Sequence, residues 1–138
     1  MVAMNAVSTD KHSQKDLNRM GAKGLKAVMN ILDKWGCGSE AKMAILRLPR
    51  ATFYKYQANP DSARLDRDQL TRISYLLNIH QALRVVFENR ENVYGFMSKK
   101  NGNPFFNGRA PLEVIEDGDF GALYETFKRV DTLRGGLW

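Results

Sequence analysis

The sequence predicts an all-α fold. Through most of the 138 residues, apolar side chains recur at every third or fourth position, which is the spacing of one buried helix face. No segment alternates apolar and polar residues in the way that a half-buried strand does. Capping residues, prolines and glycines stand where these apolar runs begin and end, as they do at helix boundaries. These three patterns together indicate a chain of mostly short helices.

The N-terminal part of the chain predicts a tail followed by a longer helix. Residues 1–15 are polar and lack periodicity, which predicts a flexible tail. From Leu17 to Trp35 the apolar residues form a single stripe, which predicts a helix. Gly36 and Gly38 are expected to end this helix, because glycine accepts the left-handed conformation that follows a helix.

Two short helices are expected next. Ser39 suits the N-cap of the first, and Pro49 suits the first position of the second. The second of these helices is expected to run through Phe53 and to end at residues 59–61, where Asn-Pro-Asp is a turn signal. Segment 39–56 thus has the layout of a helix-turn-helix, in which the second helix enters the major groove of DNA.

The helix that follows has the clearest N-terminus. Asp66 and Gln69 form a capping-box pair, with a leucine on either side in the positions of a hydrophobic staple. We expect this helix to close at Asn78, and another to follow at once through Leu83 and Phe87.

Three more short helices are expected in the last third of the chain. The first covers Val93–Ser98 and is followed by a loop. Pro111 suits the start of the second, which Gly118 ends. Asp119 suits the N-cap of the third, and its apolar stripe runs through Phe120–Val130.

The charge is divided unevenly along the chain. Residues 1–64 hold 11 basic residues (Lys and Arg) against 5 acidic ones (Asp and Glu), whereas residues 65–138 hold 10 basic and 10 acidic residues. The whole net charge of +6 therefore lies in the first half. A basic half suits a polyanion such as nucleic acid, and the alternative is a merely solvated surface. A basic half joined to a neutral one indicates two surfaces with different partners.

The chain offers little for catalysis, for a metal ion or for a membrane. Its one cysteine, Cys37, and its two histidines, His12 and His80, lack the spacing of metal ligands or of a catalytic pair. No apolar run reaches the roughly 20 residues of a membrane span, and the first residues do not read as a signal peptide. We expect a cytoplasmic protein that is not an enzyme and that holds no cofactor and no metal.

The expected helix-turn-helix supplies candidate DNA contacts. On the polar face of its second helix, Arg50 suits a guanine or a phosphate, and Lys55 suits a phosphate. Arg47 stands at a turn position often held by glycine, which favours a wider turn. The alternative is an ordinary helical hairpin whose polar face contacts only water. The predicted DNA contacts are Ser39, Lys42, Arg50, Ala51, Thr52, Tyr54 and Lys55.

The C-terminal segment carries a set of short motifs that point to a family. They are Asn103-Pro104, Gly108-Arg109, Pro111-Leu112-Glu113, Gly118-Asp119 and Arg134-Gly135-Gly136. With these motifs, residues 103–136 resemble the toxin-binding domain of Xre/MbcA/ParS-type antitoxins, and Leu17–Phe87 resembles the Xre-like helix-turn-helix domain of the same family. With the tail already expected over 1–15, the resemblance implies a helix-turn-helix DNA-binding domain over 16–88 and a toxin-binding domain over 89–138.

The resemblance also implies a function. Such antitoxins pair with a RES-type toxin that consumes NAD, or with a related ADP-ribosylating toxin, and block its active site. They also repress their own operon by binding operator DNA, usually as homodimers. One alternative is a stand-alone helix-turn-helix repressor whose C-terminal domain dimerises or senses a ligand. A small enzyme is a third hypothesis.

Large apolar residues in a loop and at the chain end favour a protein interface, since a monomer gains little by exposing them. We expect Arg134 and the last two residues to border or plug the toxin site, braced by the loop near Arg109. The two loop phenylalanines have an alternative as lids on the protein's own core. Arg109 has an alternative as a donor to nearby carbonyl groups. The predicted toxin contacts are Phe105, Phe106, Arg109, Arg134, Leu137 and Trp138.

Overall fold

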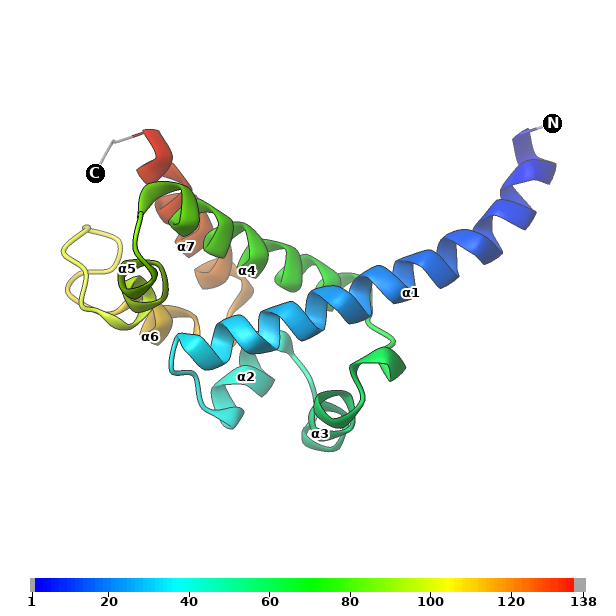
Figure 1. Ribbon diagram of the computed structural model, residues 1–138, viewed down its shortest axis with the longest axis horizontal. Coiled ribbons are helices and arrows are strands. Elements are labelled where there is room, and N and C mark those ends of the chain that lie inside the picture. The colour runs from blue at the N-terminus through cyan, green and yellow to red at the C-terminus, as the bar shows by residue number, and fades with distance from the viewer. Residues whose placement is uncertain (1, 136–138) are drawn as a thin grey trace.

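A computed structural model describes residues 2–135, with side chains from residue 14 onward, and all regular structure in this range is helical (Figure 1). The prediction of an all-α fold is confirmed. The α-helices are α1 (Val2–Lys34), α2 (Ser39–Leu46), α3 (Arg50–Ala58), α4 (Arg67–Val86), α5 (Arg90–Gly95), α6 (Pro111–Ile115) and α7 (Phe120–Thr132). Single turns of 3-10 helix are η1 (Pro60–Ser62), η2 (Phe96–Ser98) and η3 (Leu133–Gly135).

Helix α1 is longer than the sequence predicted. It begins at Val2 and not near Leu17, so most of the segment expected as a tail is helical. That segment holds no glycine or proline before Gly21, and its alanine, methionine, lysine and glutamine residues favour a helix. The first turns of α1 extend beyond the rest of the molecule (Figure 1). Farther along α1, Leu17 and Met20 are 50% and 67% exposed.

Helix α4 lies at the centre of the fold, with α1 packed on one side and α7 on the other (Figure 1). It continues to Val86, so the predicted break at Asn78 is wrong. Asn78 itself is exposed, while Leu76, Ile79 and Leu83 are buried against the neighbouring helices. Because this buried stripe continues across Asn78, packing outweighs the modest helix preference of asparagine.

The predicted capping box at the start of α4 is confirmed. The Asp66 carboxylate accepts a hydrogen bond from the Gln69 backbone N–H at 2.8 Å, and the Gln69 side-chain oxygen accepts one from the Asp66 N–H at 3.0 Å. Leu65 and Leu70, in the staple positions, both lie against Gly21 of α1. This contact joins the start of α4 to α1.

Helices α2 and α3 form the predicted helix-turn-helix, with small shifts at their ends. Gly38, not Ser39, is the N-cap of α2, and Pro49 is the N-cap of α3 and not its first residue. The wider turn expected at Arg47 is wrong. Arg47 adopts the left-handed conformation with φ 56° and ψ 47°, and the next N–H, of Leu48, donates to the carbonyl of Met43 at 2.9 Å. The turn is therefore as tight as one that glycine would make.

The C-terminal helices share a core with the N-terminal ones. Met97, Ile115, Leu123 and Val130 are buried in the same apolar cluster as the inward faces of α1 and α4. Asp119 caps α7, as predicted, by accepting from the Ala122 N–H at 2.9 Å. The helix expected over residues 93–98 is instead α5 followed by η2. The division into domains at residue 88 stays a prediction.

Gly118 marks a close contact between the two halves of the chain. Its φ is +85°, and a Cβ added there would lie 2.3 Å from the carbonyl oxygen of Ala44 in α2. Only glycine fits both the backbone conformation and this close approach. The turn before α7 is thus packed directly on the backbone of the helix-turn-helix.

Candidate functional site

The exposed face of α3 carries most of the predicted DNA contacts. Phe53 and Tyr56 are buried and fix α3 on the core, which turns Arg50, Tyr54 and Lys55 toward solvent. Ala51 is exposed as well, and Ser39 and Thr52 are partly exposed. The structure therefore brings these predicted contacts to the surface around one helix.

Arg50 already has a partner on this surface. Its guanidinium forms an ion pair with Glu40 of α2, and both side chains are largely exposed. An exposed pair of this kind is worth little, since water and salt screen it. Arg50 can therefore leave Glu40 for a phosphate or a base edge at small cost.

Lys42 does not belong to this surface, which corrects the prediction. The residue is only 5% exposed, and its ammonium group donates to the carboxylate of Asp33 at the end of α1. Lys42 is one of the buried residues of α2, since a long lysine stem can be covered while its ammonium group reaches a carboxylate. Its role in the structure is to hold these two helices together.

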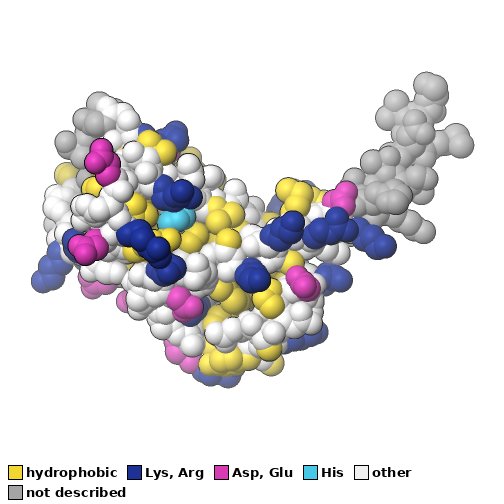
Figure 2. Space-filling view, in the orientation of Figure 1, with side chains coloured by type: hydrophobic (Ala, Val, Ile, Leu, Met, Phe, Trp, Pro, Cys, Tyr) yellow, Lys and Arg dark blue, Asp and Glu magenta, His cyan; other side chains and the backbone are white. Residues whose placement is uncertain are grey.

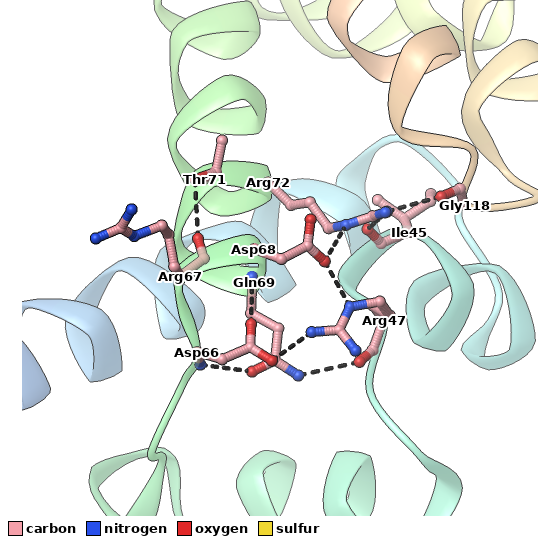
Figure 3. A network of polar contacts seen from close by, with 9 residues as sticks. All are labelled: Ile45, Arg47, Asp66, Arg67, Asp68, Gln69, Thr71, Arg72 and Gly118. Atoms are coloured by element: carbon pink, nitrogen blue, oxygen red, sulfur yellow. Dashed lines mark hydrogen bonds and ion pairs between the residues drawn. The ribbon is translucent and has the colours of Figure 1, made fainter.

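Arg47 connects the helix-turn-helix to the start of α4 (Figure 3). Its guanidinium donates to the carboxylates of both Asp66 and Asp68, and its carbonyl accepts from the Gln69 amide at 3.0 Å. The turn between α2 and α3 is thus held by side chains of α4 and its N-cap. Sequence reasoning had noted Arg47 only as a departure from glycine.

Arg72 extends this network into the C-terminal half (Figure 3). Its buried guanidinium donates to the Ile45 carbonyl at 3.1 Å, to the Gly118 carbonyl at 2.7 Å and to the Asp68 carboxylate at 2.9 Å. It also lies 5.7 Å from the centre of the Phe120 ring. One side chain therefore joins α2, α4 and the turn before α7, a role that no local pattern in the sequence indicated.

The network lowers the pKa of both carboxyl groups. For Asp66, the backbone N–H of Gln69 and then the guanidinium of Arg47 hold the pKa below its usual value. For Asp68, burial alone would raise the pKa, but hydrogen bonds from Arg47 and Arg72 outweigh it and lower the pKa. Both groups are therefore carboxylates at neutral pH.

The predicted toxin contacts differ in whether the structure buries them, exposes them or leaves them undescribed. Phe106 is fully buried, so it is a core residue, which is the alternative that the sequence left open. Arg109 is exposed, yet it donates to the carbonyls of Phe106 at 2.8 Å and of Phe105 at 3.0 Å, so it also braces its own loop. Arg134 is exposed and pairs with Asp131 at 3.1 Å. Leu137 and Trp138 lie outside the described residues.

Phe105 lies at the edge of a shallow recess next to α7. It is half-buried, with the guanidinium of Arg129 5.4 Å from the centre of its ring. Arg109, Gly121 and Glu125 line the same recess. Phe105 and Arg109 are therefore the loop residues that a protein partner could touch.

Two exposed aromatic side chains were missed by the sequence analysis. Phe120 and Tyr124 were assigned to the buried stripe of the last helix, but they are 38% and 37% exposed. Both rings lie beside Tyr75 of α4: the centre of its ring is 5.9 Å from that of Phe120 and 5.6 Å from that of Tyr124. Because α4 covers only one side of α7, the edge of the predicted stripe stays open to solvent. These rings form, with Tyr75, an aromatic surface where α7 meets α4.

The chemically reactive side chains offer no catalytic arrangement in the described part of the chain. Cys37 is buried, and burial is the main reason that its pKa is raised to about 11, so its thiol is protonated at neutral pH. Burial and then the nearby charge of Arg84 lower the pKa of His80, whose ring stacks on Tyr94. Among residues 14–135, whose side chains the structure describes, no three His, Cys, Asp or Glu side chains come together as a metal site would require. No helix in this range is both long and apolar enough to span a bilayer.

This geometry defines a helix-turn-helix protein with a helical C-terminal segment packed onto it. Residues 16–78, from α1 to the middle of α4, match the family model of the antitoxin Xre-like helix-turn-helix domain. Over these residues the chain is therefore similar to an antitoxin Xre-like helix-turn-helix domain. The chain is also 29% identical over 113 residues to the uncharacterized protein y4oB of Sinorhizobium fredii, covering 81% of this chain and 84% of that protein. No solved structure matches the chain.

Proposed function

We propose that this protein is a non-enzymatic antitoxin that binds operator DNA through α3 and neutralises a toxin through its C-terminal half. The match of residues 16–78 to an antitoxin domain carries the proposal. The partner toxin is proposed to be a RES-type enzyme that consumes NAD, or a related ADP-ribosylating enzyme, whose active site the antitoxin blocks. A homodimer suits this role, because two recognition helices would match two half-sites about 34 Å apart.

The surface of α3 supports DNA binding. Arg50 and Lys55 are exposed cations, and Tyr54 is 45% exposed between them. Cations of this kind position a protein on phosphates, while Arg and Tyr also reach base edges. Binding to DNA upstream of its own gene would let the protein repress its own operon.

The DNA half of the proposal is tested with the double variant Arg50→Ala/Lys55→Ala. It should weaken binding to the DNA upstream of the gene by about 2–4 kcal/mol, since it removes one base or phosphate contact and one phosphate contact. The double variant Lys100→Ala/Lys128→Ala removes the same charge from exposed positions outside the helix-turn-helix and serves as the control. Unchanged affinity of the α3 variant in a gel-shift titration would remove α3 as the recognition helix.

The C-terminal surface supports toxin binding. Phe105 and Arg109 border one recess beside α7, and Phe120 and Tyr124 add two exposed rings on the same helix. Aromatic and arginine side chains are the usual anchors of protein interfaces. We place the last two residues, Leu137 and Trp138, at the toxin active site as a plug.

The toxin half is tested by expressing the product of the neighbouring gene with and without this protein. We expect that product to be toxic alone, to co-purify with this chain, and to lose its toxicity in the presence of the full-length protein. Deletion of Leu137 and Trp138 should abolish protection while leaving DNA binding intact. Full protection by the truncated protein would rule out the plug, and a harmless neighbour would favour a stand-alone repressor.

A further inference from the structure

We propose that the solvent face of α1 is a second DNA-binding surface, which grips the backbone of the duplex without reading its sequence. The surface consists of five exposed cations, called here the α1 ridge: Lys15, Arg19, Lys23, Lys26 and Lys34. The proposal adds a contact surface to the proposed DNA-binding function, and it rests on that function only for the choice of duplex DNA as the ligand.

The spacing of the α1 ridge places its charges on one side of the helix. Steps of four, four, three and eight residues put all five side chains within about 100° of arc. Figure 2 shows Lys and Arg side chains lined up along α1 on this face. The opposite side of α1 carries the buried residues Leu25 and Leu32, so packing fixes which side the cations face.

Few acidic side chains offset the ridge. Residues 14–34 hold two, Asp16 and Asp33. Asp16 lies 3.6 Å from Arg19, and Asp33 accepts from Lys42, which belongs to α2. Lys23 and Lys26, in the middle of the ridge, make no ion pair within the described part of the chain, so their charge faces solvent.

The ridge continues into other cations at both ends. At one end, Lys15 and Arg19 share a shallow recess with Arg64 and with one acidic residue, Asp61. At the other, the Lys34 ammonium and the Arg90 guanidinium lie 5.4 and 5.5 Å from the centre of the same Tyr94 ring. The basic surface therefore extends from the turn next to α3 to the start of α5.

The size and position of the ridge fit a duplex. From Lys15 to Lys34 the helix rises about 28 Å, which is the length of about eight base pairs. Helices α1 and α3 both pack on η1, so the Lys15 end of the ridge lies near the proposed recognition helix. Phosphates that flank a site bound at α3 would thus lie close to this end of the ridge. A row of phosphates is the ligand whose charge matches a row of lysines.

The double variant Lys23→Gln/Lys26→Gln tests the ridge, and Lys100→Gln/Lys128→Gln is its control with the same net charge. Affinities for a random-sequence duplex and for the DNA upstream of the gene are measured by fluorescence anisotropy over a range of salt concentrations. The ridge variant should lose about tenfold or more in affinity for both duplexes, and its salt slope should fall by about 1.8, or 0.9 for each lost phosphate contact. The ratio of the two affinities should stay that of the wild type.

The ridge proposal is overturned if the ridge variant binds the random duplex within twofold of the wild type, or if the control loses as much. Circular dichroism checks that both variants fold. A different result would contradict the proposed recognition by α3 without bearing on the ridge: binding of the wild type to the upstream DNA no more tightly than to the random duplex. The Arg50→Ala/Lys55→Ala variant should lower the ratio of the two affinities, which the ridge variant leaves unchanged.

Discussion

The helix-turn-helix and the C-terminal half are attached to α4 by different kinds of contact. At the start of α4, charged side chains make the contact: Arg47 and Arg72 both donate to the Asp68 carboxylate, and Arg72 also donates to the Ile45 backbone carbonyl. Farther along, α7 packs on α4 through the ring of Tyr75 and the buried side chains of Leu123 and Val130. The side chains that each half uses to pack on α4 are engaged in contacts within the protein. The place where each half packs on α4 therefore decides which of its charged and aromatic residues stay on the surface.

The comparison explains why the sequence located one surface better than the other. On α3, the polar residues predicted to face DNA are exposed. The division of a short helix into an apolar and a polar face depends only on residues a few positions apart, so the sequence shows it. In the C-terminal half, Phe106 was expected at an interface and is buried, while Phe120 was expected in the core and is partly exposed. Aromatic residues serve both cores and interfaces, so only the packing partners distinguish the two.

The largest effect is expected from Gly118→Ala, which disrupts the point where the two halves touch. The added Cβ would clash with the Ala44 carbonyl and would occupy a positive φ, so we expect a loss of about 3–5 kcal/mol in the free energy of unfolding. Gly108→Ala is the matched control, because its φ is +83° but nothing lies within 4 Å of the new Cβ. It should cost about 1 kcal/mol. Equal losses in chemical denaturation would mean that the contact with Ala44 contributes nothing.

Arg72→Met should have the next largest effect. The variant leaves two buried carbonyls without their donor and removes a partner of Asp68, so we expect a loss of about 2–4 kcal/mol. Arg67→Met removes an exposed arginine from the same helix and should change stability by less than about 0.5 kcal/mol. If the two variants unfold at the same denaturant concentration, the link between the halves does not depend on Arg72.

A smaller effect separates the backbone of Arg47 from its side chain. Both Arg47→Gly and Arg47→Ala remove the ion pairs with α4, but only glycine adopts the left-handed conformation without strain. The Gly variant should therefore melt about 3 °C higher than the Ala variant. Equal melting temperatures would mean that the turn relaxes out of the left-handed conformation when arginine is lost.

The smallest effect is expected from acid. The folded-state pKa values of Asp66 and Asp68 lie below the ordinary aspartate value of 3.8, so the stability that these carboxylates contribute is present above that pH. This stability is lost as the pH falls below 3.8 and then through the folded-state pKa values of the two carboxyl groups. Asp66→Asn/Asp68→Asn should therefore show a shallower loss of stability than the wild type between pH 4 and pH 2. If the double variant loses stability as steeply as the wild type over this range, the assignment is wrong. Glu91→Gln changes an exposed carboxylate elsewhere in the chain and serves as the control.

Much of the fold could be predicted because its signals are local. The capping box at Asp66, the N-cap at Asp119 and the turn at residues 59–61 each involve side chains a few positions apart. Asn78 misled the prediction, because the helix continues there through contacts with helices distant in sequence. The sequence does not predict the start of α1, because residues 1–15 lack the apolar periodicity by which a packed helix is recognised.

The candidate DNA surface shows the same limit at the level of single residues. Lys42 looked like a rim contact, since lysine on a short helix next to a turn faces solvent more often than not. Its burial depends on Asp33, nine positions earlier and on another helix. A pairing of this kind becomes visible only when α1 and α2 are packed together.

By itself, the sequence determined the helical class, the helix-turn-helix and the charge of the first half, because periodicity, caps and composition act over a few neighbouring residues. The tertiary structure decided which cations stay on the surface, which aromatic rings are covered, and that Arg72 joins the two halves at Gly118. These properties depend on which helices meet. Helices are brought together by contacts between residues far apart in the chain, and no local pattern records those contacts.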